Sequence, residues 1–111
     1  MVSGLLSGKY LRNTPMPADA RLTLHAARYG GRFINDTNWA VVERLEAFCA
    51  QRGRTLLELA FGWLAAQPCV SSVIAGATRP EQIEQNVRAA EWIPMPGDLR
   101  EVDALVKSAT P

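Results

Sequence analysis

Cysteine is scarce in this sequence, and long apolar runs are missing. The two cysteines, Cys49 and Cys69, are too far apart for a C-x-x-C motif, so they give no signal of a metal site, and we expect both to be buried free thiols. No apolar run approaches the roughly 18 residues of a membrane-spanning helix, and Met1–Leu6 is too short for the core of a signal peptide. The sequence therefore predicts a cytoplasmic protein with no metal and no membrane partner.

An excess of charge of one sign is also missing. The 111 residues contain 12 Lys and Arg against 11 Asp and Glu, a net charge of +1, and basic residues are scattered among acidic ones. Nucleic-acid binding needs a clustered basic surface, so we expect no nucleic-acid partner. Apolar residues make up 48% of the chain, and this length suits one small globular domain over residues 1–111.

Helical periodicity dominates the rest of the pattern. Apolar residues recur at helical spacing over 37–52, behind a start signal at Asn35 and before a stop at Gly53. Thr55 and Glu58 form a T-x-x-E capping box in front of a second apolar-faced segment. These signals predict two consecutive amphipathic helices.

Two further helices are expected near the end of the chain. One covers about 79–90. The last begins at Asp98, which forms another capping pattern with Glu101, and it turns an apolar face inward.

One strand is predicted, from Val70 to Ala75, and a helix start follows it at once. Thr78 and Glu81 make a capping box, Arg79 adds a positive charge, and Pro80 suits the first helical turn, where an N–H has no intrahelical partner. An anion at the amino end of this helix would sit over the carboxyl end of the strand, where α/β barrels bind phosphate. The pattern therefore predicts a phosphomonoester site.

The stretch 70–86, V-S-S-V-I-A-G-A-T-R-P-E-Q-I-E-Q-N, resembles the cofactor-binding end of the aldo-keto reductases, a family of NADP(H)-using (β/α)8 barrels. Ser3–Tyr10 looks like the loop after the family's seventh strand, and Ala20–Leu22 is similar to a basic position farther along that loop. The resemblance spans about the whole chain, which looks like the last third of a reductase. It implies an α/β fold class, as the C-terminal portion of a (β/α)8 barrel: an incomplete barrel, mostly helical, with one clear strand.

The resemblance also implies a set of cofactor-binding residues. The loop against which the pyrophosphate lies contains Gly4, Leu5, Gly8 and Lys9, with Arg21 as a further cation. Gln85 stands where many members carry a Glu that binds the adenine amine, and a neutral amide can still accept that hydrogen bond. The residues at the positions that hold the 2′-phosphate and adenine are Gly76, Thr78, Arg79, Gln82, Gln85 and Asn86.

The function implied is NADP(H)-dependent reduction of a small carbonyl substrate, or oxidation of an alcohol, by hydride transfer. The family's catalytic Asp, Tyr, Lys and His lie on earlier strands, which no part of this sequence resembles, and we expect no catalytic role for His25, Tyr10 or Tyr29. The chain alone is therefore expected to be inactive, because it lacks both the acid that protonates the alkoxide and a cavity that holds the nicotinamide.

Two alternatives remain open at this point. The chain could be a non-catalytic module that binds NADP or docks on an intact barrel, or a non-functional gene remnant. A single strand without neighbours would expose two edges and the inner faces of the helices, so we also expect a surface able to self-associate.

Overall fold

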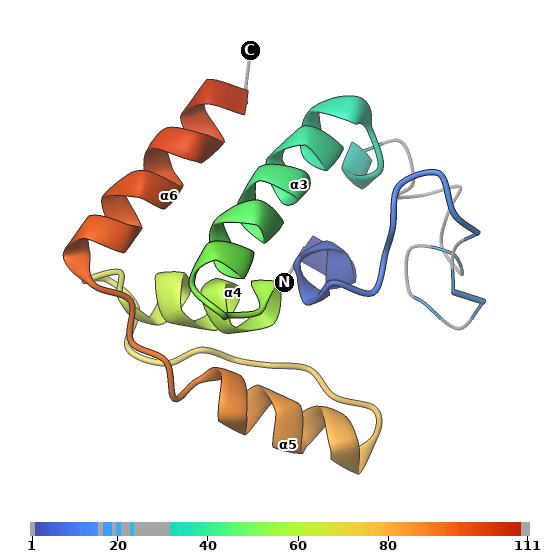
Figure 1. Cartoon of the computed structure of the whole chain (residues 1–111). Helices are drawn as coiled ribbons and strands as arrows, with labels where there is room; N and C mark the ends of the chain where they lie inside the picture. Colours follow the sequence, from blue (N-terminus) through green and yellow to red (C-terminus); the bar gives the residue numbers. More distant parts are fainter. Residues whose placement is uncertain (1, 16, 19, 21–22, 24–31, 110–111) are drawn as a thin grey trace.

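The computed structural model describes residues 2–15, 17–18, 20, 23 and 32–109, and the described part is helical. A short 3-10 helix η1 (Val2–Ser7) comes first. The α-helices that follow are α3 (Asp36–Gln51), α4 (Leu56–Ala65), α5 (Pro80–Ala89) and α6 (Pro96–Ala109). Figure 1 shows α3 and α6 side by side, with α4 below them and α5 beyond α4.

The helix expected over 37–52 is confirmed as α3. Its N-cap is Asn35, whose side chain accepts a hydrogen bond from the backbone N–H of Asn38 at 2.9 Å. After the C-cap Arg52, the chain turns at Gly53 with φ of +63°, a left-handed conformation that glycine adopts without steric cost.

The capping box in front of α4 is also confirmed. Thr55 Oγ1 accepts from the N–H of Glu58, and Glu58 Oε1 accepts from the N–H of Thr55, both at 3.2 Å. Two N–H groups that a helix start leaves without partners are thereby satisfied by local side chains.

The last helix begins two residues earlier than expected, at Pro96, so the predicted start at Asp98 is wrong. Asp98 lies in the first turn and accepts from the N–H of Met95 at 3.1 Å, while Glu101 reaches Arg52 instead of closing a capping box. Proline favours the first helical position, because its φ is already helical and it has no N–H to leave unpaired.

Arg52 joins the end of α3 to the start of α6. Its guanidinium donates to Asp98 at 2.9 Å and to Glu101 at 2.7 Å, and it stacks on the Phe48 ring with 3.7 Å to the ring centroid. Asp98 is half-buried, and its hydrogen bond with Arg52 lowers the pKa of the carboxyl below its ordinary value of 3.8. This contact fixes how the two helices meet.

The core lies between η1, α3, α4 and α6. Helix α3 contributes an apolar stripe at helical spacing, and η1 adds Leu5 and the Tyr10 ring just beyond it. The buried residues of the cluster are Leu5, Tyr10, Ala20, Trp39, Val42, Leu45, Phe48, Cys49, Leu56, Leu59 and Val102.

The two thiols have opposite environments. Cys49 is a buried core residue, as expected, and burial raises the pKa of its thiol to about 11. Cys69 is exposed, so the expectation of a second buried thiol is wrong. Its burial was expected because a free cysteine behaves as a small apolar side chain, but Cys69 lies in the turn after α4, outside the core.

The predicted strand from Val70 to Ala75 is not present, nor is any other strand in the described ranges. The segment is extended, but a strand also needs a hydrogen-bonded neighbour, and none of the described segments pairs with it. Ile74, within this segment, is 98% exposed. Within the described residues, no helix has the length and apolar character needed to cross a membrane.

Candidate functional site

Helix α5 begins one residue later than the expected capping box would place it. Its N-cap is Arg79, with extended φ and ψ of −138° and 149°, and Pro80 lies in the first turn. A residue before proline is pushed toward extended backbone, so the helix starts at Pro80 and Thr78 lies one residue too early to cap it. The Thr78–Glu81 capping box is therefore wrong, since α5 has no side-chain hydrogen bond at its N-cap.

Thr78 is instead held by a side chain one turn into α5. Gln82 Oε1 accepts from the backbone N–H of Thr78 at 2.7 Å and from its hydroxyl at 3.2 Å. One turn farther on, Asn86 Nδ2 donates to the carbonyl of Gly76 at 3.5 Å. Residues at i and i+4 lie on one face of a helix, so these two amides hold the loop Gly76–Thr78 along that face.

The structure therefore brings together four of the six residues expected at the phosphate and adenine end. The remaining two, Arg79 and Gln85, are exposed, and neither side chain makes a hydrogen bond or ion pair with a described residue. Arg79 lies at the amino end of α5, where the helix dipole is also positive. An anion would find there a cation that no described carboxylate neutralises.

The expected pyrophosphate loop is compact. Gly4 and Gly8 have φ of +95° and +80°, in the left-handed region that favours glycine. The Lys9 side chain crosses directly over Gly4, where a Cβ would clash with its Cε, and its Nζ lies 5.5 Å from the centroid of the Tyr10 ring. Leu5 packs in the core, so its side chain faces away from solvent.

The two groups of expected ligands lie on different elements, η1 and α5. Helix α4 contacts both, and Figure 1 shows η1 beside one end of α4 and α5 below it. Lys9 is exposed on the η1 side, while Gln82 and Asn86 lie on the α5 side. Arg21 lies outside the described residues. Each half of the expected site is thus formed locally, by its own loop.

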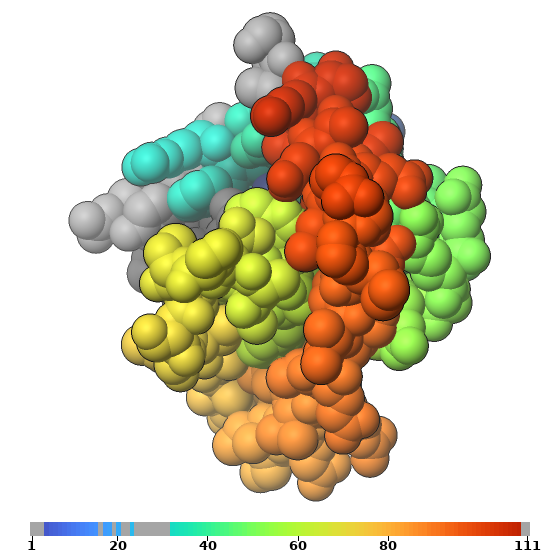
Figure 2. Space-filling model, turned by 90° about the vertical axis from the view of Figure 1, so that its left-hand side faces the viewer, coloured from blue at the N-terminus to red at the C-terminus, as the bar shows by residue number. Residues whose placement is uncertain are grey.

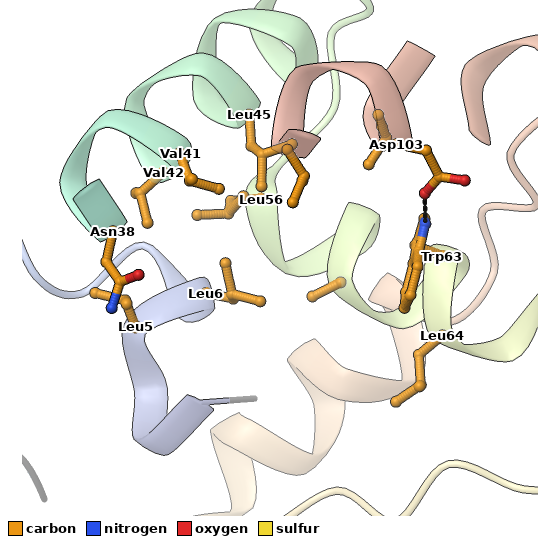
Figure 3. A pocket seen from close by; sticks show the side chains of 13 residues that line it. Leu5, Leu6, Asn38, Val41, Val42, Leu45, Leu56, Trp63, Leu64 and Asp103 are labelled. Carbon is orange, nitrogen blue, oxygen red and sulfur yellow. Dashed lines mark hydrogen bonds between the residues drawn. The ribbon is translucent and has the colours of Figure 1, made fainter. Parts of the chain in front are cut away.

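An apolar hollow of about 520 Å³ opens between η1, α3, α4 and α6, and the sequence did not point to it (Figure 3). Most of its wall is formed by aliphatic side chains. The other lining residues are Asn38, Trp63 and Asp103, and Trp63 Nε1 donates a hydrogen bond to Asp103 Oδ1 at 3.0 Å. Trp63 packs, partly buried, against the core cluster. The sequence gave no sign of this hydrogen bond, because Asp103 lies on a different helix from Trp63.

Known proteins resemble this chain over most of its length. A sequence model of the aldo/keto reductase family matches residues 1–107. The chain is 36% identical to the probable voltage-gated potassium channel subunit beta of Oryza sativa subsp. japonica, over 97% of this chain and 34% of that protein. It is 34% identical to the L-glyceraldehyde 3-phosphate reductase of Escherichia coli (strain K12), over 80% of this chain and 26% of that protein.

A shorter match, 37% identical over 49 residues, links it to the NADH-specific methylglyoxal reductase of Escherichia coli (strain K12), over 44% of this chain and 15% of that protein. The chain spans about a third of the length of the potassium-channel subunits that it matches. The family is one of (β/α)8 barrels that generally use NAD(P)H and act on small carbonyl compounds. The match over 1–107 confirms the resemblance, and this chain belongs to the aldo/keto reductase family.

Proposed function

We propose that the chain is the C-terminal part of a (β/α)8 barrel and supplies the NADP(H)-binding end of a cytoplasmic carbonyl reductase. The observation that carries this proposal is the amino-terminal half of α5. There, Gln82 and Asn86 hold the Gly76–Thr78 loop, while the Arg79 guanidinium has no carboxylate partner among the described residues. A 2′-phosphate at this place would meet a fixed cation and the positive end of the helix.

The residues fit a phosphomonoester in their chemistry. Arg79 would form a charge-assisted hydrogen bond with the phosphate, while Gln82, which accepts from both the N–H and the hydroxyl of Thr78, holds the loop beside it. Gln85 and Asn86 lie farther along α5, and their amides can both donate to and accept from an adenine edge.

The pyrophosphate would lie against the η1 loop. Gly4 and Gly8 let the backbone approach it closely, the backbone of Leu5 lies between them, and Lys9 and Arg21 would neutralise its charge. Lys9 is exposed, and its only described ring contact is with Tyr10, so its ammonium can swing toward an anion at small cost.

When bound, the reduced nicotinamide supplies the hydride that reduces a small carbonyl compound. This chain binds and orients the adenosine and pyrophosphate end of the cofactor. The acid that protonates the product belongs to the family's catalytic residues on earlier strands, which no part of this sequence resembles. We therefore expect no carbonyl reduction by the 111 residues alone. Nothing in the comparisons favours a separate regulatory module or a gene remnant.

Exposed apolar side chains near α5 also support the proposal that the chain associates with itself. Ile74 and Ile93 are 98% and 81% exposed on the segments that flank α5.

The Arg79→Ala variant tests the phosphate pocket. We expect its Kd for NADP+ to rise by about tenfold or more, as for the loss of one charge-assisted hydrogen bond, with the Kd for NAD+ unchanged. Arg88→Ala is the matched control, because it removes the same charge from the last turn of α5. An equal loss for both cofactors in Arg79→Ala would show that Arg79 does not contact the 2′-phosphate.

A further inference from the structure

Arg12 joins the loop that follows η1 to the amino-terminal half of α3. Its guanidinium donates to Asp36 Oδ1 at 2.7 Å through Nη2 and to Glu43 Oε2 at 3.3 Å through Nη1. The two carboxylates are related as i and i+7 on α3, so they lie on the same face of the helix. One planar side chain therefore bridges both, a geometry for which arginine is better suited than lysine.

The chain on either side of Arg12 is also held in place. The Tyr10 side chain is 1% exposed and belongs to the core. After Arg12 the chain turns at Asn13, with φ of +59°, and the Thr14 hydroxyl donates to the carbonyl of Leu11 at 2.8 Å. Tyr10 thus fixes the loop from inside, and Arg12 fixes it from the solvent side through residues 24 and 31 positions farther along the chain.

Lys9 and Arg12 differ in how their charges are used. The Lys9 ammonium lies 5.5 Å from the centroid of the Tyr10 ring and forms no ion pair with a described carboxylate. The Arg12 guanidinium already contacts two carboxylates. An anion at this loop would therefore meet the Lys9 charge, whereas Arg12 determines where the backbone that carries Lys9 lies.

We propose that Arg12 is a positioning residue for the cofactor's pyrophosphate. By pairing with Asp36 and Glu43, it holds the Gly4–Lys9 loop in the shape that accepts the anion, without contacting the anion itself. A loop that is ordered before binding does not lose that freedom on binding, and affinity is gained. This inference rests on the proposed function, because it takes the pyrophosphate to lie against this loop.

Removing the two carboxylates distinguishes positioning from direct contact. The variant Asp36→Asn/Glu43→Gln makes this surface more positive, and simple attraction would then strengthen the binding of an anionic cofactor. If Arg12 acts through its ion pairs, binding should weaken despite the more favourable charge. We expect the Kd for NADP+ to rise by about three- to tenfold, as for the loss of two exposed ion pairs.

Calorimetric titration of the purified chain with NADP+, NAD+ and adenosine 2′-phosphate tests the inference. Arg12→Ala should raise the Kd for both dinucleotides by the same factor, about three- to tenfold, because both carry a pyrophosphate. The Kd for adenosine 2′-phosphate, which carries none, should not change. Arg44→Ala is the matched control: it removes the same charge from α3, and its partner Ser108 lies on α6, which runs along the face of the molecule seen in Figure 2.

The outcomes separate this inference from the proposed function. If the parent binds NADP+ and Arg12→Ala binds it equally well, the inference is wrong and the phosphate pocket stands. Tighter binding by Asp36→Asn/Glu43→Gln would also overturn the inference, since Arg12 would then contact the anion directly. If the parent binds neither NADP+ nor adenosine 2′-phosphate, the proposed function fails, and the inference fails with it.

Hydrogen exchange of the cofactor-free chain gives a second reading. The amides of residues 4–10 should exchange faster in Arg12→Ala than in the parent, while those of α4 exchange at the same rate. Arg12→Lys should lie between the two, because an ammonium keeps the charge but lacks the planar fork that bridges both carboxylates. Equal exchange of this loop in the parent and in Arg12→Ala would show that Arg12 does not order it.

Discussion

Gln82 Oε1 accepts two hydrogen bonds from Thr78, one from the backbone N–H at 2.7 Å and one from the hydroxyl at 3.2 Å. One amide therefore fixes the turn that leads into α5, at the place where the proposed 2′-phosphate would bind. The first prediction concerns this contact.

Replacing Gln82 by Ala should weaken NADP+ binding by about three- to tenfold, because the loop loses the amide that holds it against α5 beside Arg79. The helical content, measured by circular dichroism, should not change, since both residues lie near the surface. Glu84→Ala, on the same helix and exposed, is the control. Unchanged NADP+ affinity in Gln82→Ala would mean that the loop needs no such support.

The core around α4 predicts a large loss of stability in Leu59→Ala. Leu59 is 2% exposed, and emptying such a site costs about 2–5 kcal/mol of unfolding free energy. Leu11→Ala, at a side chain that is 57% exposed, should change the unfolding free energy by less than about 0.5 kcal/mol. Urea unfolding measures both. Similar effects of the two variants would show that Leu59 is not packed as described.

The link between Arg52 and Asp98 predicts a specific acid sensitivity. The hydrogen bond lowers the pKa of Asp98 in the folded chain, so its stabilising effect is present above the unfolded pKa of about 3.8 and is lost as the pH falls through the lower folded pKa. The urea midpoint of Asp98→Asn at pH 7 should be lower than that of the parent chain. It should also decrease less steeply than the parent's as the pH is lowered below 4. If the urea midpoint of Asp98→Asn depends on pH as the parent's does, other carboxyl groups are responsible for the loss of stability in acid.

The thiols should differ sharply in reactivity. Because the thiolate is the reactive form, Cys49, with a pKa of about 11 and no solvent access, should resist alkylation at pH 8, whereas exposed Cys69 should react. Mass spectrometry after brief treatment with iodoacetamide should find one label, and none in Cys69→Ser. Labelling of Cys49 under these conditions would show that the core opens readily.

Local signals predicted the helices well. The Asn35 start, the Gly53 stop and the Thr55–Glu58 box each act within a few residues, so the sequence alone places both ends of α3 and the start of α4 to within about one residue. The helix expected over about 79–90 is confirmed as α5, but its capping box does not form, and the start of α6 was misplaced by two residues. Pro80 and Pro96 fix the backbone more strongly than the T-x-x-E and D-x-x-E patterns that compete with them.

The strand could not be predicted from its own residues. Val70 to Ala75 has the composition of a strand, but pairing depends on neighbours that none of the described residues supply. The burial of Cys69 was expected from the apolar character of a free thiol, which does not determine whether its segment packs on the core. In the candidate site, the expected cofactor-binding residues were identified from the resemblance to the family. The hydrogen bonds between Gln82 and Thr78 depend on side-chain geometry, which sequence spacing does not determine.

The central claim is that this chain binds NADP(H) through its 2′-phosphate, and calorimetric titration of the purified 111 residues with NADP+ and with NAD+ tests it most directly. The account predicts micromolar binding of NADP+ and binding of NAD+ that is at least tenfold weaker. No heat with either cofactor at millimolar concentration, or equal affinity for both, would contradict it.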